Sequence, residues 1–174
     1  MKHLLPALVL LLIACGQADT HSTDPTSVAD TSASSVPVID LSAYDVPLHF
    51  TPPERQLTGG DSATISWKEE TGQLIIKAGD HFGLAIIEDA GDVARLKADL
   101  DRDLLRKNTI LREAPGMIIY KSEFPGDAGL VQIHFYQVIS AGERTFVAQD
   151  LDAHTYTEQD VDRMIGCLVR KPSA

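Results

Sequence analysis

The chain has 174 residues, of which 44% are hydrophobic, and this length and composition are typical of one globular domain. Its 25 acidic residues outnumber 15 Lys and Arg, giving a formal charge of −10. No stretch collects the basic residues into a stripe, so nucleic acid is excluded as an expected partner. Two cysteines cannot form a disulfide framework, and no Cys and His spacing is typical of a zinc site.

The N-terminal segment, residues 1–14, is predicted to be a signal peptide. Lys2 and His3 precede an apolar run of about 10 residues, and a helix that crosses a bilayer needs about 20. The run ends in Leu12-Ile13-Ala14-Cys15, which resembles the lipobox of bacterial lipoproteins. The resemblance implies cleavage between Ala14 and Cys15 and acylation of the Cys15 thiol. The alternatives are an ordinary secretory signal with a chance cysteine, or a buried N-terminal strand.

Residues 15–36 are predicted to be the lipidated cysteine followed by a disordered tether. This stretch is mostly Ser, Thr, Asp, Ala and Gly with no aromatic residue, so it cannot bury enough apolar surface to offset its ordering entropy. Gly16 follows the cysteine where an Asp favours inner-membrane retention in Gram-negative sorting. By resemblance to that rule, the outer membrane is the expected address. The folded domain is expected over residues 37–174.

The first half of the domain is expected to be mainly strands. Two short extended segments precede the break at Pro52-Pro53, and a period-two alternation then begins after Gly59-Gly60. Turns near Gly72 and Gly79 separate three strands in meander order, with Trp67 in the core. These strands contain, in order, Ala63, Ile65 and Trp67; Leu74, Ile75 and Ile76; and Phe82, Leu84 and Ile86.

A helical period follows these strands. Val93, Leu96, Leu100 and Leu104 recur at three- and four-residue spacing, which predicts one apolar helix face. Asp92 is the expected N-cap and Asn108 the expected stop.

The second half returns to strands and closes with another helix. Thr157 to Asp160 is typical of a capping box with Asp in place of Glu, and it opens the last helix. The expected fold is α+β, a single domain with a mainly antiparallel sheet and with a central helix and a C-terminal helix packed on one face. The expected strands are 110–111, 117–120, 131–135 and 145–148, the last two joined by a turn at 140–143, and the last helix carries Val161, Met164, Ile165 and Leu168 on one face.

Four segments carry a family resemblance: 40–44, Pro52-Pro53-Glu54, 117–120 and 157–165. Together they resemble a group of uncharacterised small bacterial lipoproteins similar in layout to the Mog1/PsbP-like α+β fold. The resemblance covers most of residues 37–171. It implies a fold and an envelope location, with no activity and no functional residue.

One motif suggests a serine nucleophile. Gly60-Asp61-Ser62-Ala63 resembles the Gly-Asp-Ser-Leu block of a hydrolase family, which also needs a later Asp-x-x-His pair. The nearest equivalent, Asp150 with His154, is one residue too long, and the oxyanion blocks are missing. A Gly-rich turn that leads into a strand explains the same letters. We therefore assign no catalytic residue and no enzymatic activity, and keep a hydrolase using Ser62 and His154 as the alternative.

Two acidic runs have the opening spacing of a calcium loop. In Asp99-x-Asp101-x-Asp103 the sixth and twelfth positions are not Gly and Glu, and a helical pattern makes this run a solvated helix face. Asp150-x-Asp152-x-His154 also lacks these residues, which leaves only weak surface cation or small-ligand binding as a possibility. The sequence assigns no metal and no cofactor.

Two other residues have chemistry to offer. His134 lies on the strand face opposite Ile133 and Phe135, either at the sheet surface or in a pocket with Tyr120 and Tyr136. Cys167 is expected to be a partly buried small hydrophobe.

The favoured interpretation is a non-enzymatic envelope lipoprotein that binds or scaffolds another component of the periplasm or outer membrane. Its expected partners are the bilayer, through acylated Cys15, and an envelope protein.

Overall fold

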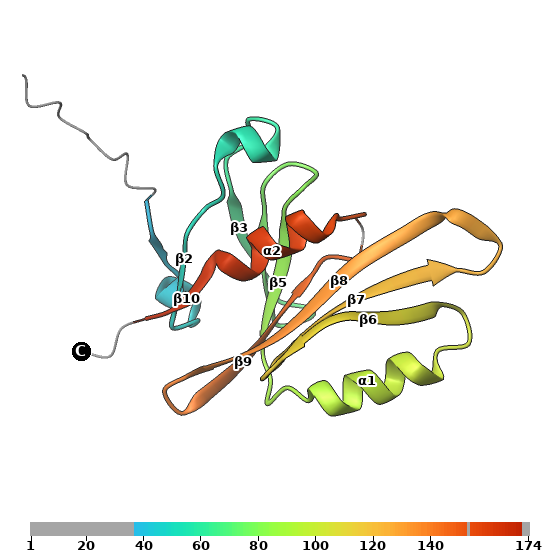
Figure 1. Cartoon of the computed structure of the whole chain (residues 1–174). Helices are drawn as coiled ribbons and strands as arrows, with labels where there is room; N and C mark the ends of the chain where they lie inside the picture. The colour runs from blue at the N-terminus through green and yellow to red at the C-terminus, as the bar shows by residue number, and fades with distance from the viewer. Residues whose placement is uncertain (1–36, 153, 172–174) are drawn as a thin grey trace, which may run out of the picture. The chain divides into compact units, whose positions relative to one another are not determined.

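The computed structural model describes residues 37–152 and 154–171, and these form an α+β fold, as expected (Figure 1). The predicted signal peptide, Cys15 and the tether lie outside the described residues. The strands form two sheets, one of seven strands and one of three, and every strand pair is antiparallel.

The seven-stranded sheet has the order β3-β4-β5-β9-β8-β7-β6. The meander of β3, β4 and β5 is confirmed, and so is the turn that joins β8 to β9, where Ala141 pairs with Arg144. The bounds are β3 Thr64–Lys68, β4 Gln73–Lys77, β5 Gly83–Glu88, β6 Lys107–Ala114, β7 Met117–Phe124, β8 Asp127–Ala141 and β9 Arg144–Asp150.

The three-stranded sheet joins the two ends of the described domain. In it β2 (Leu48–Phe50) lies between β1 (Ile39–Asp40) and β10 (Leu168–Arg170). Two 3₁₀ helices flank β2 in the chain, η1 (Leu41–Tyr44) and η2 (Arg55–Thr58). Placing Leu168 in the last helix was wrong, because this residue pairs with Phe50 in the sheet instead.

The C-terminal helix α2 (Glu158–Gly166) begins with the predicted capping box. The Asp160 backbone N–H donates to the Thr157 hydroxyl, and the Thr157 N–H donates to the Asp160 carboxylate at 2.9 Å. Burial by itself raises the pKa of Asp160, but the hydrogen bonds that its carboxylate accepts from Thr157 and Arg163 outweigh burial and lower that pKa below 3.8. Val161 and Met164 are fully buried, so this helix contributes directly to the core.

The other helix, α1 (Val93–Arg102), is shorter than its apolar period predicts. Asp92 is the N-cap, as expected, and its carboxylate accepts from the Arg95 N–H at 2.9 Å. Leu104 lies beyond the helix and is 95% exposed, so its placement on the buried face was wrong. The helix ends at Asp103 because that side chain accepts from the backbone N–H groups of the next turn and offers the chain a local alternative to helix. Asn108 belongs to β6 and not to the helix. Its side-chain amide donates to Leu100 O at 3.0 Å, so it supplies a hydrogen bond to a carbonyl in the last turn of α1.

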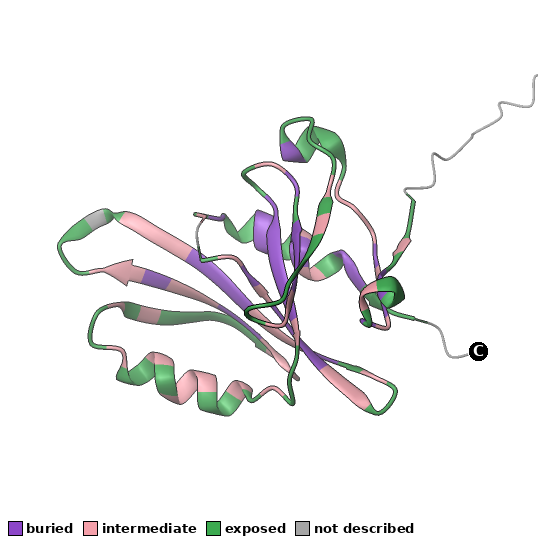
Figure 2. Cartoon of the chain, turned by 180° about the vertical axis from the view of Figure 1, so that it is seen from behind, coloured by how far each residue is buried: buried purple, intermediate pink, exposed green. Residues whose placement is uncertain are grey.

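α2 packs across one face of the seven-stranded sheet, whereas α1 lies alongside the edge strand β6 (Figure 1). Val161 and Met164 of α2 join Phe135 in the core, whereas the chain just before α1 contacts the other face, where the Asp92 N–H donates to the Tyr136 hydroxyl. The expectation that both helices pack on one face was therefore wrong. Figure 2 shows buried residues on the strands and on α2, and α1 has no buried residue.

The core lies between the seven-stranded sheet, α2 and β2. Its largest fully buried side chains include Phe50, Phe82, Phe135 and Phe146. Trp67 was expected in the core but is 47% exposed, because β3 is an edge strand. Over residues 37–152 and 154–171, no helix has the length and apolar character needed to cross a membrane.

Candidate functional site

The last residue of β9 is a buried aspartate whose carboxylate accepts a hydrogen bond that the backbone of a longer β9 would otherwise accept. Asp150, 5% exposed, is the last residue of β9. Its Oδ1 accepts from the Phe135 backbone N–H at 2.8 Å, a donor that a continuing strand would have paired with a carbonyl. Its Oδ2 lies 2.7 Å from Nδ1 of His134. One side chain therefore ends the β8–β9 ladder and holds the histidine ring.

His134 is buried in β8, with an exposed fraction of 2%. It faces Tyr120 across the β7–β8 pair, and the two ring centroids lie 5.0 Å apart. A carboxylate can only accept, so the hydrogen of this bond belongs to Nδ1; in the neutral imidazole the other ring nitrogen, Nε2, is then an acceptor. Among the described residues this Nε2 has no hydrogen-bond partner. Buried polar atoms are nearly always paired, so an unpaired ring nitrogen is a candidate for a ligand.

Asp152 adds a second carboxylate to the cluster. One ligand atom from each of His134, Asp150 and Asp152 lies within 4.8 Å of the other two, and Asp152 is exposed in the turn after β9. Burial raises the pKa of Tyr120, and the charges of Asp150 and Asp152 raise it further. The tyrosine therefore keeps its proton in the field of both carboxylates.

Tyr156 lies in the same region and is buried. The Tyr156 hydroxyl has no partner within the part of the chain that the structure describes. Burial raises its pKa, and the charges of Asp150 and Asp160 contribute. Gly83 makes room for this ring, because a Cβ at that position would lie 2.5 Å from the hydroxyl oxygen.

The two residues of the hydrolase alternative are held in different surroundings. Ser62 is exposed and lines a surface hollow of about 360 Å³ with Pro52, Asp61 and others, and no histidine is among the residues that line it. The His154 ring lies against Tyr156, with the ring centroids 5.8 Å apart. In residues 37–152 and 154–171 no hydrogen bond joins Ser62 to His154, so no observation favours this pair as a nucleophile and base.

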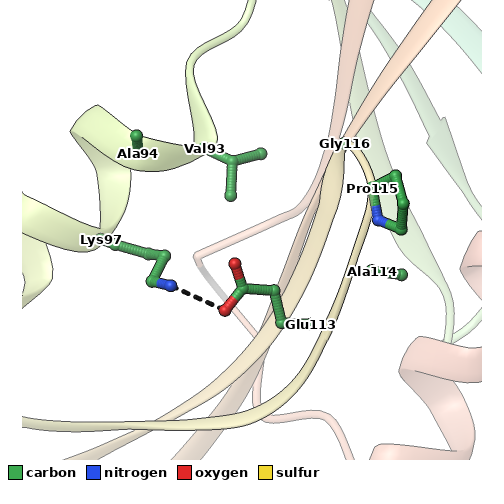
Figure 3. Close-up of a pocket in the computed structure, with 7 residues that line it drawn as sticks. All are labelled: Val93, Ala94, Lys97, Glu113, Ala114, Pro115 and Gly116. Carbon is green, nitrogen blue, oxygen red and sulfur yellow. Dashed lines mark hydrogen bonds and ion pairs between the residues drawn. The ribbon is translucent and has the colours of Figure 1, made fainter.

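Another hollow lies between α1 and the β6–β7 turn (Figure 3). It measures about 600 Å³, and on its wall Lys97 Nζ lies 2.7 Å from Glu113 Oε2. Both side chains of this ion pair are partly exposed, and no unpaired buried polar atom lines the hollow within the described chain. The described lining of this hollow therefore contains no unpaired buried group that could bind a ligand, in contrast to the cluster of His134, Asp150 and Asp152.

The acidic run on α1 behaves as a solvated helix face. Asp99 is within 3.9 Å of guanidinium nitrogens of Arg95 and Arg102, and Asp103 accepts from Arg106.

Cys167 is 7% exposed, and burial raises the pKa of its thiol to about 11. This agrees with its expected role as a small buried hydrophobe.

The sequence singled out all three residues of the cluster but did not join His134 to the two carboxylates. It grouped Asp150 and Asp152 with His154, whereas the structure groups them with His134 from the neighbouring strand. No protein family, curated protein or solved structure matches the chain. The candidate site is therefore defined by the residues of this chain alone.

Proposed function

We propose that the chain is a membrane-anchored bacterial envelope lipoprotein whose folded domain is a non-enzymatic binding or accessory module. The single observation that carries the proposal is the sequence Leu12-Ile13-Ala14-Cys15 at the end of a short apolar run. A diacylglycerol thioether on Cys15 supplies two acyl chains. Stable anchoring needs that, because a single acyl chain gives only marginal binding.

The location within the envelope follows from the residue after the cysteine. Gly16 stands where Asp would favour the inner membrane, so we propose the outer membrane. The tether of residues 16–36 would have a root-mean-square reach of about 25 Å as a flexible coil. The folded domain would then meet partners in the periplasm while the lipid anchor stays in the bilayer.

A binding role is favoured by what the folded domain offers. Its most unusual chemistry is a buried imidazole and two carboxylates, which is a set suited to holding a ligand. Two leucines after α1, Leu104 and Leu105, are 95% and 79% exposed. We also propose the Mog1/PsbP-like layout that the sequence resembles, and the α+β class of the described domain, with its antiparallel sheets, supports the coarser part of it.

The anchor is tested by exchanging one thiol at a time. The Cys15→Ser chain should lose incorporation of labelled palmitate and should leave the membrane pellet after a carbonate wash. The Cys167→Ser chain is the matched control, because this thiol is buried in the folded domain, and it should behave as the unmodified chain. A Cys15→Ser chain that is still acylated and still sediments with membranes would overturn the proposal.

A further inference from the structure

The loop between α1 and β6, residues 103–106, presents the two most exposed large apolar side chains of the described chain. Leu104 is 95% exposed and Leu105 is 79% exposed, whereas the other large apolar side chains at the surface are between 37% and 57% exposed. Two adjacent leucines that stay in water are a candidate contact surface, unlike a single exposed apolar residue. We call residues 103–106 the leucine loop.

The leucine loop is held in this conformation by its own first residue. The Asp103 carboxylate accepts from the backbone N–H of Leu105 at 2.8 Å and from that of Arg106 at 3.2 Å. It also accepts from the Arg106 guanidinium at 2.8 Å, so its negative charge is already paired. The two leucine side chains are therefore the part of the loop that is left to the solvent.

Positive charge gathers around the leucine loop. Residues 95–121 carry seven Lys and Arg against four Asp and Glu, in a chain whose formal charge is −10. Arg102 precedes the loop and is 79% exposed, and Lys107 follows it and is 75% exposed. Their ion pairs with Asp99 and Glu123 are long, at 3.9 and 3.8 Å. This excess is too small for the stripe of a nucleic-acid-binding protein, but it places two accessible cations beside the two leucines.

We propose that the leucine loop is a second contact with the bilayer, in which Leu104 and Leu105 enter the interface and Arg102 and Lys107 meet the phosphates of anionic phospholipids. Interfacial segments bind in this way, with apolar side chains at the boundary between headgroups and acyl chains and with Lys and Arg attracted to anionic lipid. The charge also selects the orientation, because the rest of the chain is strongly acidic and is repelled by the same surface.

The anchor proposed above brings the leucine loop to the bilayer, and the inference rests on it. Figure 1 shows this loop at the opposite end of the domain from β1, the first described strand. The tether of residues 16–36 would span up to about 70 Å when extended. A domain of about 140 residues has a radius of gyration of about 14 Å, so the tether would let any face of the domain reach the lipid. The leucine loop would then decide which face does so.

The test places one fluorophore on the leucine loop of the full acylated chain. Leu104→Cys, in a chain that also carries Cys167→Ser, is labelled with an NBD group, and the sulfur of acylated Cys15 is a thioether that does not react. The chain is reconstituted into vesicles that contain phosphatidylglycerol and spin-labelled phosphatidylcholine. We expect the spin label to quench this probe at least twofold more than a probe at Glu70→Cys, in the exposed turn between β3 and β4 at the opposite edge of the sheet.

The charges are tested in the same labelled chain. Arg102→Gln with Lys107→Gln should abolish the extra quenching while the chain stays on the vesicle, and the melting temperature should not change because both side chains are exposed. Lys68→Gln with Lys77→Gln is the matched control, since it removes two exposed lysines on β3 and β4. This control should be quenched as strongly as the chain that keeps all four cations.

Each other outcome is decisive. Equal quenching of the probes at positions 104 and 70, or quenching that the loss of Arg102 and Lys107 leaves unchanged, would overturn the contact. A blue-shifted probe that the spin label does not quench would assign the leucines to a protein contact and would also overturn it. Flotation with neutral phosphatidylcholine vesicles separates the two proposals. A chain that does not float has lost both, whereas one that floats with an unquenched probe has lost only the contact of the leucine loop.

Discussion

Replacing Asp150 by Ala should destabilise the domain by about 3–5 kcal/mol. The carboxylate accepts from the Phe135 N–H at 2.8 Å and pairs with His134 at 2.7 Å, and all of these groups are buried. Alanine leaves two buried donors without an acceptor, and each costs about 1–3 kcal/mol. The stability of a domain of this size is about 5–15 kcal/mol, so the variant should still fold.

Urea unfolding followed by circular dichroism measures the change as a shift in the midpoint at constant slope. Asp150→Asn is the matched variant, because it keeps one carbonyl oxygen for the Phe135 N–H and its amide can donate to the other tautomer of His134. It should cost about half as much as the alanine variant, since one polar contact is weakened and none is left empty. Equal losses for the two variants, or a loss below about 1 kcal/mol for alanine, would refute the role given to Asp150 at the end of the β8–β9 ladder.

Other predictions follow from packing and titration. Gly83→Ala should destabilise by about 1–3 kcal/mol, because its Cβ would press on Tyr156, whereas Gly166→Ala, in a helix with open space around it, should stabilise by about 0.5–1 kcal/mol. Thermal melts of both variants should show opposite signs, and a shared sign would contradict the packing. The lowered pKa of Asp160 means that its stabilisation is present above the ordinary value of 3.8 and is lost as the pH falls through the folded value. Acid titration of Asp160→Asn should therefore show a smaller loss than that of the unmodified chain, and parallel curves would disagree with this. In the Cys15→Ser chain, a Cys167 pKa near 11 leaves about a hundredfold less thiolate than an ordinary thiol at neutral pH. Reaction with Ellman's reagent should be slow in buffer and fast in urea, and equal rates would show that the thiol is not protected.

Local signals predicted the elements that depend on nearby residues. The N-cap at Asp92 and the capping box at Thr157 require only side chains within three positions, and both are present as expected. The hairpin between β8 and β9 is equally local. An α+β fold with an antiparallel sheet could therefore be predicted without tertiary information.

The errors have two sources, pairing with a distant segment and a local side chain that outweighs the apolar period. Leu168 continues the apolar period of α2, yet pairing with Phe50 draws it into a sheet. Leu104 continues the period of α1, but Asp103 ends that helix first. The contact between His134 and Asp150 depends on the register of β8 against β9. No sequence motif in this chain specifies that register.

Because β2 is flanked by β1 and β10, the first and last strands of the domain meet on a single three-residue strand. Phe50 and Leu168 are roughly 120 residues apart in the chain, and closing a loop of that length costs about 4 kcal/mol in chain entropy. The hairpins of the large sheet join residues that are close in the chain, so they can form before this long loop closes. The small sheet should thus form last, and the rate of this final closure should govern how long the newly made domain exposes its apolar interior.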